Sequence, residues 1–199
     1  MARPASSASS TSATIELEPT PGAILGSRMT NRPVHSVVAI PLLEARVLTT
    51  RWRRPRALDA HVTIAAPFLD PAHIDDRVVE VLAECLATSA AFDVTFGSVE
   101  WFAQRVVYVA PEDPTPFEHL AAALADAFPT VLAARAGARY VAHLTVAKNR
   151  PLAELHEAAA ACASRLPLRA RAREVVLYLY DPLLNAWRER TRVPLDPLG

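Results

Sequence analysis

Residues 60–65 read Ala-His-Val-Thr-Ile-Ala, and residues 142–147 repeat this phrase as Ala-His-Leu-Thr-Val-Ala. Each copy places an imidazole and a hydroxyl two positions apart within an apolar run. Side chains two positions apart point to the same face of a β-strand, so the histidine and the threonine share one face and the aliphatic residues take the other. The repeat predicts two equivalent strands that bring two imidazoles and two hydroxyls into one pocket.

The apolar pattern around each phrase predicts the same order of elements, β-α-β-α-β, in two halves of the chain. In the first half we expect strands over 35–40, around His61 and over 92–102, with helices over 42–53 and 72–90. In the second half we expect strands over 105–109, around His143, over about 167–180 and over 187–194, with helices over 116–128 and 151–164. The sequence therefore predicts an α+β fold with a duplicated, two-lobe architecture, in which antiparallel sheets carry helices outside and a central cleft lies between the lobes.

The first 33 residues differ from the rest of the chain. Residues 5–12 contain only alanine, serine and threonine, and the segment lacks the apolar core of a secretory signal. Such a composition buries too little apolar surface to offset the entropy of ordering. We expect a disordered low-complexity tail over 1–33 and a single bilobal domain over 34–199.

The composition limits the classes of protein to which the chain can belong. Its 199 residues are 51% apolar and carry no formal net charge, which argues against a protein that coats nucleic acid. No apolar run approaches the roughly 20 residues that cross a bilayer. Cys85 and Cys162 lie in segments expected to be helical, and we expect buried free thiols, with a disulfide as the alternative. The predictions are a cytoplasmic monomer without a membrane partner.

The two histidine phrases resemble the signature of the two-histidine (2H) phosphoesterases. This superfamily includes the bacterial 2′-5′ RNA ligase-like proteins and the RNA 2′,3′-cyclic phosphodiesterases. The resemblance covers about residues 35–196, and it extends to Pro67-Phe68 and to a terminal hairpin over about 175–195. It also includes Lys148, at a position where many relatives carry arginine. The loop Asp181-Pro182-Leu183-Leu184 departs from the family, in which many members have a small polar residue there, and this leaves substrate preference open.

The resemblance implies a hydrolase that acts on a 2′,3′-cyclic phosphate or on a 2′-linked (oligo)nucleotide. One of His61 and His143 would activate water and the other would protonate the leaving oxygen, because imidazoles near neutral pH serve either role. Thr63 and Thr145 would donate hydrogen bonds to the phosphate. We expect no metal and no cofactor, because no cluster of histidines and carboxylates has metal-ligand spacing.

Two further residues are candidates for substrate contact. Lys148 is the only lysine among 21 basic residues, and it lies next to a predicted catalytic strand, so we predict that its ammonium binds phosphate. Phe68 is a candidate for stacking on a base or sugar, with loop packing as its alternative. The alternating arginines at 169, 171 and 173 and at 188, 190 and 192 form either a phosphate-binding wall or the solvated face of a sheet.

Two other functions use the same pocket. A binding module would hold RNA or a nucleotide without turnover, and a 2′-5′ RNA ligase would use the same groups in the opposite direction. Each histidine could also be a polar residue on a half-buried strand, with threonine present for its strand propensity. In every functional version the expected partner is a nucleotide or a short RNA.

Overall fold

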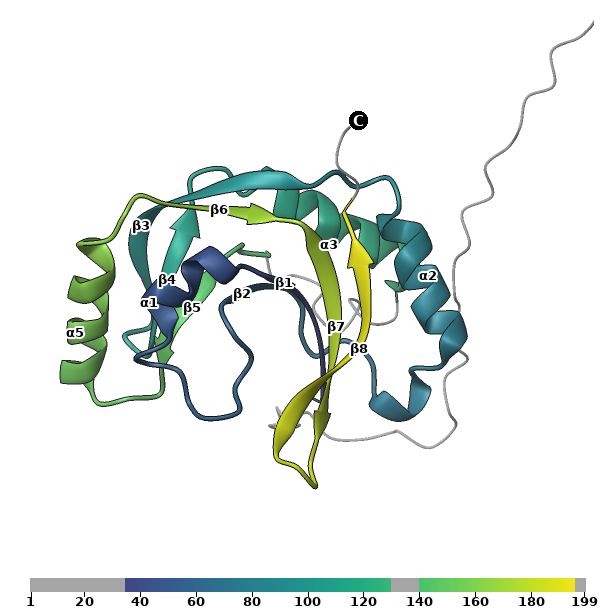
Figure 1. The fold of residues 1–199 in the computed structure, drawn as a ribbon, viewed down its shortest axis with the longest axis horizontal. Helices are drawn as coiled ribbons and strands as arrows, with labels where there is room; N and C mark the ends of the chain where they lie inside the picture. Colours follow the sequence, from purple (N-terminus) through teal and green to yellow (C-terminus); the bar gives the residue numbers. More distant parts are fainter. Residues whose placement is uncertain (1–34, 130–139, 196–199) are drawn as a thin grey trace, which may run out of the picture.

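The computed structural model describes residues 35–129 and 140–195. Its strands form one antiparallel sheet of eight, in the order β6-β3-β4-β5-β2-β1-β7-β8, which curls into an arch with helices around it (Figure 1). The strands are β1 (Ser36–Pro41), β2 (His61–Ala65), β3 (Phe92–Phe102), β4 (Val106–Pro111), β5 (Leu144–Lys148), β6 (Leu168–Ala172), β7 (Glu174–Asp181) and β8 (Ala186–Pro194). The helices are α1 (Arg46–Thr49), α2 (Asp76–Leu86), α3 (Thr115–Ala127) and α5 (Leu152–Ala163), with 3₁₀ turns η1 (Leu43–Ala45) and η2 (Pro71–His73). The predicted α+β fold is confirmed, and the tail expected over 1–33 lies outside the described residues.

The two lobes are the two halves of this one sheet. One lobe is β2-β1-β7-β8 and the other is β5-β4-β3-β6, so each lobe has its histidine phrase on its innermost strand. β2 and β5 meet at the centre, where Val62 is paired with Leu144. The expected duplication therefore brings the two equivalent motif strands side by side.

The halves of the sequence do not coincide with the lobes. β3 belongs to the first half of the chain but pairs with β4 and β6 of the other lobe. β7 belongs to the second half but pairs with β1. The short turn between β3 and β4 explains the first exchange, because two consecutive strands joined by so few residues form a hairpin. Each lobe is thus completed by a strand from the other half.

The main differences from the sequence predictions concern three elements. The helix expected over 42–53 is only η1 followed by the single turn α1, after which Thr50 donates both its amide and its hydroxyl to the carbonyl of Arg46. The helix expected from residue 72 begins at Asp76, because the Asp75 carboxylate caps it by accepting from the Val78 amide at 2.9 Å. The single strand expected over 167–180 is β6 and β7, which pair at opposite ends of the sheet.

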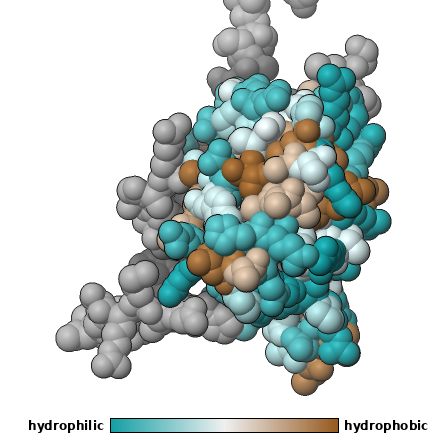
Figure 2. Space-filling model, turned by 90° about the vertical axis from the view of Figure 1, so that its left-hand side faces the viewer, coloured by the Kyte–Doolittle hydropathy of each residue, from teal (hydrophilic) through white to brown (hydrophobic). Residues whose placement is uncertain are grey.

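The core is packed by side chains from both lobes and from the helices. α2 buries Val78, Val81, Leu82 and Leu86 at helical spacing, and it packs against α3. The largest fully buried side chains include Phe96 on β3 and Phe117 on α3. On the face beside α5, hydrophobic side chains form small separate areas among polar ones (Figure 2).

Candidate active site

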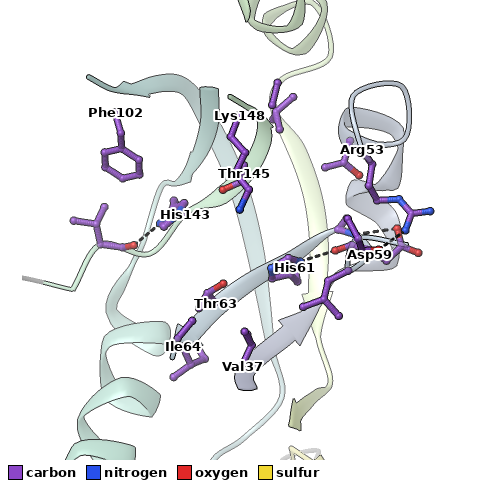
Figure 3. A pocket seen from close by; sticks show the side chains of 18 of the residues that line it. Val37, Arg53, Asp59, His61, Thr63, Ile64, Phe102, His143, Thr145 and Lys148 are labelled. Carbon is purple, nitrogen blue, oxygen red and sulfur yellow. Dashed lines mark hydrogen bonds between the residues drawn. The ribbon is translucent and has the colours of Figure 1, made fainter. Parts of the chain in front are cut away.

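The two histidine phrases line one cavity of about 1070 Å³. His61 and Thr63 reach it from β2, and Thr145 and Lys148 reach it from β5 (Figure 3). His143 also lines it, from the position immediately before β5 rather than from within the strand. Val62 and Leu144, which alternate with these residues, are fully buried. The predicted convergence of two imidazoles and two hydroxyls is therefore present in the structure.

Each imidazole is held by the same backbone contact. Nδ1 of His61 lies 2.6 Å from the carbonyl oxygen of Asp59, and Nδ1 of His143 lies 2.7 Å from the carbonyl oxygen of Val141. A carbonyl oxygen only accepts, so Nδ1 carries the proton and donates it in both rings. Among the residues that the structure describes, Nε2 of neither ring has a hydrogen-bond partner. In the neutral form this nitrogen can accept a proton, and in the cationic form it can donate one.

The cavity lowers the pKa of both imidazoles. Burial is the main cause for each ring, because it penalises the charged form. The nearby Lys148 ammonium lowers both values further, and His143 adds to the effect on His61. The carbonyl contacts act in the opposite direction, as does the Asp59 carboxylate on His61, but these effects are smaller than that of burial. Burial and the Lys148 charge therefore favour the neutral form of each ring over the cationic form.

A titration followed by NMR checks this electrostatic description. We expect the ring resonances of His61 and His143 to titrate with midpoints below pH 6.5, the ordinary pKa of histidine. The variant Lys148→Gln removes a positive charge that disfavours the imidazolium, so both midpoints should move to higher pH. Midpoints at or above 6.5, or midpoints that Lys148→Gln leaves unchanged, would contradict the description.

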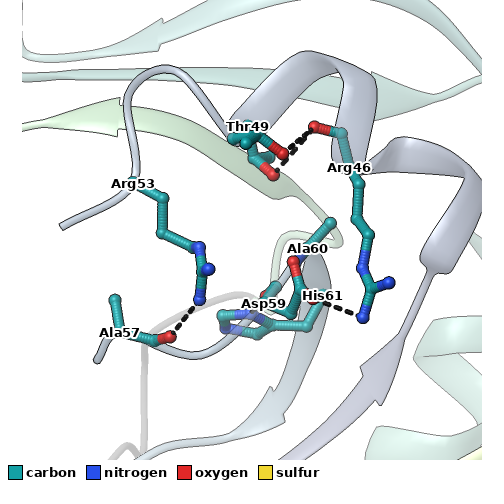
Figure 4. A network of polar contacts seen from close by, with 8 residues as sticks. Arg46, Thr49, Arg53, Ala57, Asp59, Ala60 and His61 are labelled. Carbon is teal, nitrogen blue, oxygen red and sulfur yellow. Dashed lines mark hydrogen bonds and ion pairs between the residues drawn. The ribbon is translucent and has the colours of Figure 1, made fainter. Parts of the chain in front are cut away.

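An ion pair supports the segment that presents His61. Arg46 of α1 reaches the Asp59 carboxylate at 2.5 Å (Figure 4). The other oxygen of that carboxylate accepts from the amide of Ala60 at 2.9 Å. Asp59 thus anchors the chain with its side chain while its carbonyl orients His61. Sequence reasoning missed this pair, and the only available signal was the position of Asp59 two residues before the histidine.

Aromatic side chains form a wall beside His143. Phe102 and Tyr108 stack on each other with ring centroids 4.1 Å apart. Both meet the His143 ring edge-on, at 5.0 Å and 5.4 Å. Tyr140 lines the cavity and donates its hydroxyl proton to the Thr63 carbonyl at 3.0 Å, and burial raises its pKa. The two aromatic rings limit the positions that the His143 ring can adopt. The Tyr140 hydrogen bond connects the segment before β5 to β2.

Phe68 does not take the predicted place in the site. Its ring is only 5% exposed and packs edge-on against Phe128, with centroids 4.9 Å apart. A ring buried in this way has no free face for a base or sugar. The burial of Phe68 disfavours the predicted substrate contact and agrees with the alternative prediction of loop packing.

The alternating arginines of the terminal strands lie outside the cavity lining. Most of them pair with carboxylates: Arg171 with Asp93, Arg173 with Glu44, Arg188 with Asp181, Arg190 with Asp76, and Arg192 with Glu174 and Glu189. Carboxylate partners neutralise the charge that a phosphate-binding wall would need. These arginines therefore match the alternative prediction, the solvated face of a sheet, and the structure adds that most of them are ion-paired.

The two cysteines, possible metal ligands and possible membrane-spanning helices complete the survey of the described residues. Cys85 and Cys162 are free thiols, as expected, but only Cys162 is fully buried while Cys85 is half-buried; burial raises the pKa of each to about 11. Within residues 35–129 and 140–195, no three or more His, Cys, Asp or Glu side chains gather where they could hold a metal ion. None of the helices in the described part of the chain is long and apolar enough to span a membrane.

Comparisons with known proteins identify a family and a set of similar folds. A family model described as the 2′-5′ RNA ligase superfamily matches residues 41–182. The Escherichia coli protein LigT in complex with 3′-AMP has a similar fold, with a TM-score of 0.51 and 18% identity over 82% of this chain and 99% of that chain. LigT in complex with ATP has a TM-score of 0.52 and 19% identity, over 82% of this chain and 98% of that chain. TT0787 of Thermus thermophilus has a TM-score of 0.57 and 15% identity, over 83% of this chain and 100% of that chain. No curated protein sequence matches the chain.

Proposed function

The chain belongs to the 2′-5′ RNA ligase superfamily, and with it to the 2H phosphoesterases; on this premise we propose that it is a metal-independent phosphodiesterase. Its substrate is a nucleotide that carries a 2′,3′-cyclic phosphate, or a 2′-linked oligonucleotide. The observation that carries the proposal is the pair of imidazoles in one cavity, each with Nδ1 held by a carbonyl and with no partner on Nε2 in the described part of the chain. Two such nitrogens supply the base and the acid that hydrolysis of a phosphodiester requires.

These two imidazoles can supply both proton transfers that the hydrolysis of a cyclic phosphate requires. The neutral imidazole takes a proton from water through Nε2, and the water oxygen forms a bond to phosphorus. The bond from phosphorus to the 2′ or 3′ oxygen breaks, and the protonated imidazole gives its Nε2 proton to that oxygen. The product is a phosphate monoester beside a free hydroxyl. Nδ1 of His61 and Nδ1 of His143 make the same contact with a backbone carbonyl, so the two rings are equally suited to act as base or as acid. We therefore assign the two roles to the pair and not to one ring each.

Three side chains are suited to the charge that builds on the phosphate. The hydroxyls of Thr63 and Thr145 lie on β2 and β5, each two residues after its imidazole, and line the same cavity. Hydrogen-bond donors fixed in advance stabilise a developing charge without reorganisation. The Lys148 ammonium adds a full positive charge close to both imidazoles. That LigT has been solved with 3′-AMP and with ATP supports a nucleotide as the ligand class.

Replacing Thr145 by valine tests this assignment, because valine has the same shape without the hydroxyl. A hydrogen bond to a charged group contributes about 1.5–3 kcal/mol, so we expect kcat/KM to fall by roughly 10- to 150-fold. Thr63→Val should cause a similar loss. Thr191→Val on β8, outside the cavity lining, is the matched control and should leave kcat/KM within about twofold of the unmodified protein. Equal effects at all three positions would contradict the assignment.

The proposal is tested with the four nucleoside 2′,3′-cyclic monophosphates, followed by ³¹P NMR. We expect conversion to a single monoester, because one oxygen of the ring is released next to the acid. The same spectra identify the competing functions. Nucleotide that binds but stays cyclic would indicate a binding module, and formation of a 2′-5′ bond from a cyclic end and a free 5′-hydroxyl, without hydrolysis, would indicate a ligase. Either result would overturn the proposal.

A further inference from the structure

The cavity is lined by two arginines in addition to Lys148, the cation near the imidazoles. Arg53 and Arg54 line it from the loop between α1 and β2. Figure 3 shows Arg53 on the side of His61 that is remote from His143 and Lys148. Lys148 is the cation whose charge acts on both imidazoles. Arg53 therefore lies across His61 from His143, and Arg54, the next residue of the same loop, lines the cavity as well and bonds to Asn149.

These two guanidinium groups are not neutralised by carboxylates, unlike their neighbours. Arg46, Arg51 and Arg150 each pair with a carboxylate: Asp59, Glu157 and Glu154. Arg53 instead donates to the Ala57 carbonyl at 2.7 Å, and Arg54 donates to the Asn149 carbonyl at 3.4 Å. Within the described ranges, neither has an acidic partner. A guanidinium carries five N–H donors, so each keeps donors for an anion.

The charge of the lining is also favourable for an anion at this end. The acidic lining residues are Asp59, which Arg46 already neutralises, and Glu118, which comes from α3. The cavity volume of about 1070 Å³ slightly exceeds the range for sites of drug-sized ligands, about 300–1,000 Å³. The site thus has both the space and the positive charge for a group beyond the reacting phosphate.

We propose that Arg53 and Arg54 form a second phosphate subsite, so that the preferred substrates carry a further phosphate besides the reacting one. The chemistry that they recognise is a phosphate oxygen pair, to which a guanidinium donates two parallel hydrogen bonds. Such a phosphate is supplied either by an internucleotide linkage or by a terminal 5′-phosphate. The proposal rests on the proposed function for the identity of the reacting phosphate.

Kinetics with three substrates test this subsite and distinguish the two sources of the phosphate. The substrates are adenosine 2′,3′-cyclic phosphate, the same nucleotide with a 5′-phosphate, and an adenosine dinucleotide that ends in a 2′,3′-cyclic phosphate. We expect kcat/KM to be at least about tenfold higher for one or both substrates that carry the extra phosphate. The double variant Arg53→Gln/Arg54→Gln should abolish this ratio. Arg169→Gln removes a charge on β6 outside the cavity lining, and it should preserve the ratio.

A binding measurement tests the second phosphate subsite independently of turnover. Calorimetry compares adenosine 3′-monophosphate with adenosine 3′,5′-bisphosphate as ligands. We expect the bisphosphate to bind at least about tenfold more tightly, and the double variant to remove that difference. Equal affinities, or an equal loss for both ligands in the double variant, would overturn the subsite. Absence of turnover with a retained bisphosphate preference would overturn the proposed function and leave the subsite standing.

Discussion

The variant His143→Ala is expected to hydrolyse a nucleoside 2′,3′-cyclic phosphate about 10²–10⁴-fold more slowly than the unmodified protein. The variant loses one of the two Nε2 nitrogens that transfer protons, while the cavity and the other imidazole remain. His61→Ala should cause a loss of the same order, because both rings are held by the same carbonyl contact. The measurement is kcat from initial rates, together with nucleotide affinity by calorimetry. Affinity should fall much less than kcat.

Two comparisons make this result specific. His73→Ala removes an exposed imidazole outside the cavity lining, and its kcat should remain within about twofold of the unmodified protein. The double variant His61→Ala/His143→Ala should lose about as much as either single variant, because residues that act as one unit are not additive. Losses that multiply in the double variant, or a single variant with full activity, would contradict a mechanism that couples the two rings.

The second large effect is expected on stability. Leu144 is fully buried on β5, directly opposite Val62, at the only pairing that joins the two lobes within the described sheet. Leu144→Ala removes apolar contacts and leaves a cavity in the packed interior, which costs about 2–5 kcal/mol in the free energy of unfolding. Urea unfolding followed by circular dichroism measures this change. Because Leu144 lies between His143 and Thr145, the variant should lose activity in parallel with its stability.

The matched control for Leu144 is Leu183→Ala. Leu183 is 94% exposed in the turn between β7 and β8, so the same change in side chain should alter the free energy of unfolding by less than about 0.5 kcal/mol. Similar losses at the two leucines would show that the contact between β2 and β5 is not a packed core. It would also remove the basis for placing the two histidine phrases next to each other.

The parts of the site that were predictable depend on local pattern. His61 and Thr63 are two residues apart, and strand geometry alone places them on one face. The repetition at His143 and Thr145 then implies that two equivalent strands meet, and the central pair β2–β5 confirms it. The helices α3 and α5 were also predictable, because their apolar spacing is that of a buried helix face.

The parts that were not predictable depend on contacts between distant segments. Phe68 packs on Phe128, and nothing near either residue in the sequence indicates this contact. The pairing of β3 and β7 with the opposite lobes follows from how the whole sheet closes, which periodicity within a strand does not specify. The same holds for the ion pair between Arg46 and Asp59, because most charged residues in the chain are equally plausible partners before the fold is known.

The most direct test of the two-imidazole mechanism is turnover of the four nucleoside 2′,3′-cyclic monophosphates by the unmodified protein in EDTA. We predict hydrolysis to a monoester at the same rate before and after chelation, and no gain when Mg²⁺ or Zn²⁺ is restored, because the two imidazoles supply both proton transfers. Hydrolysis that stops in EDTA and returns with a divalent cation would contradict the mechanism, as would the absence of turnover for all four nucleotides.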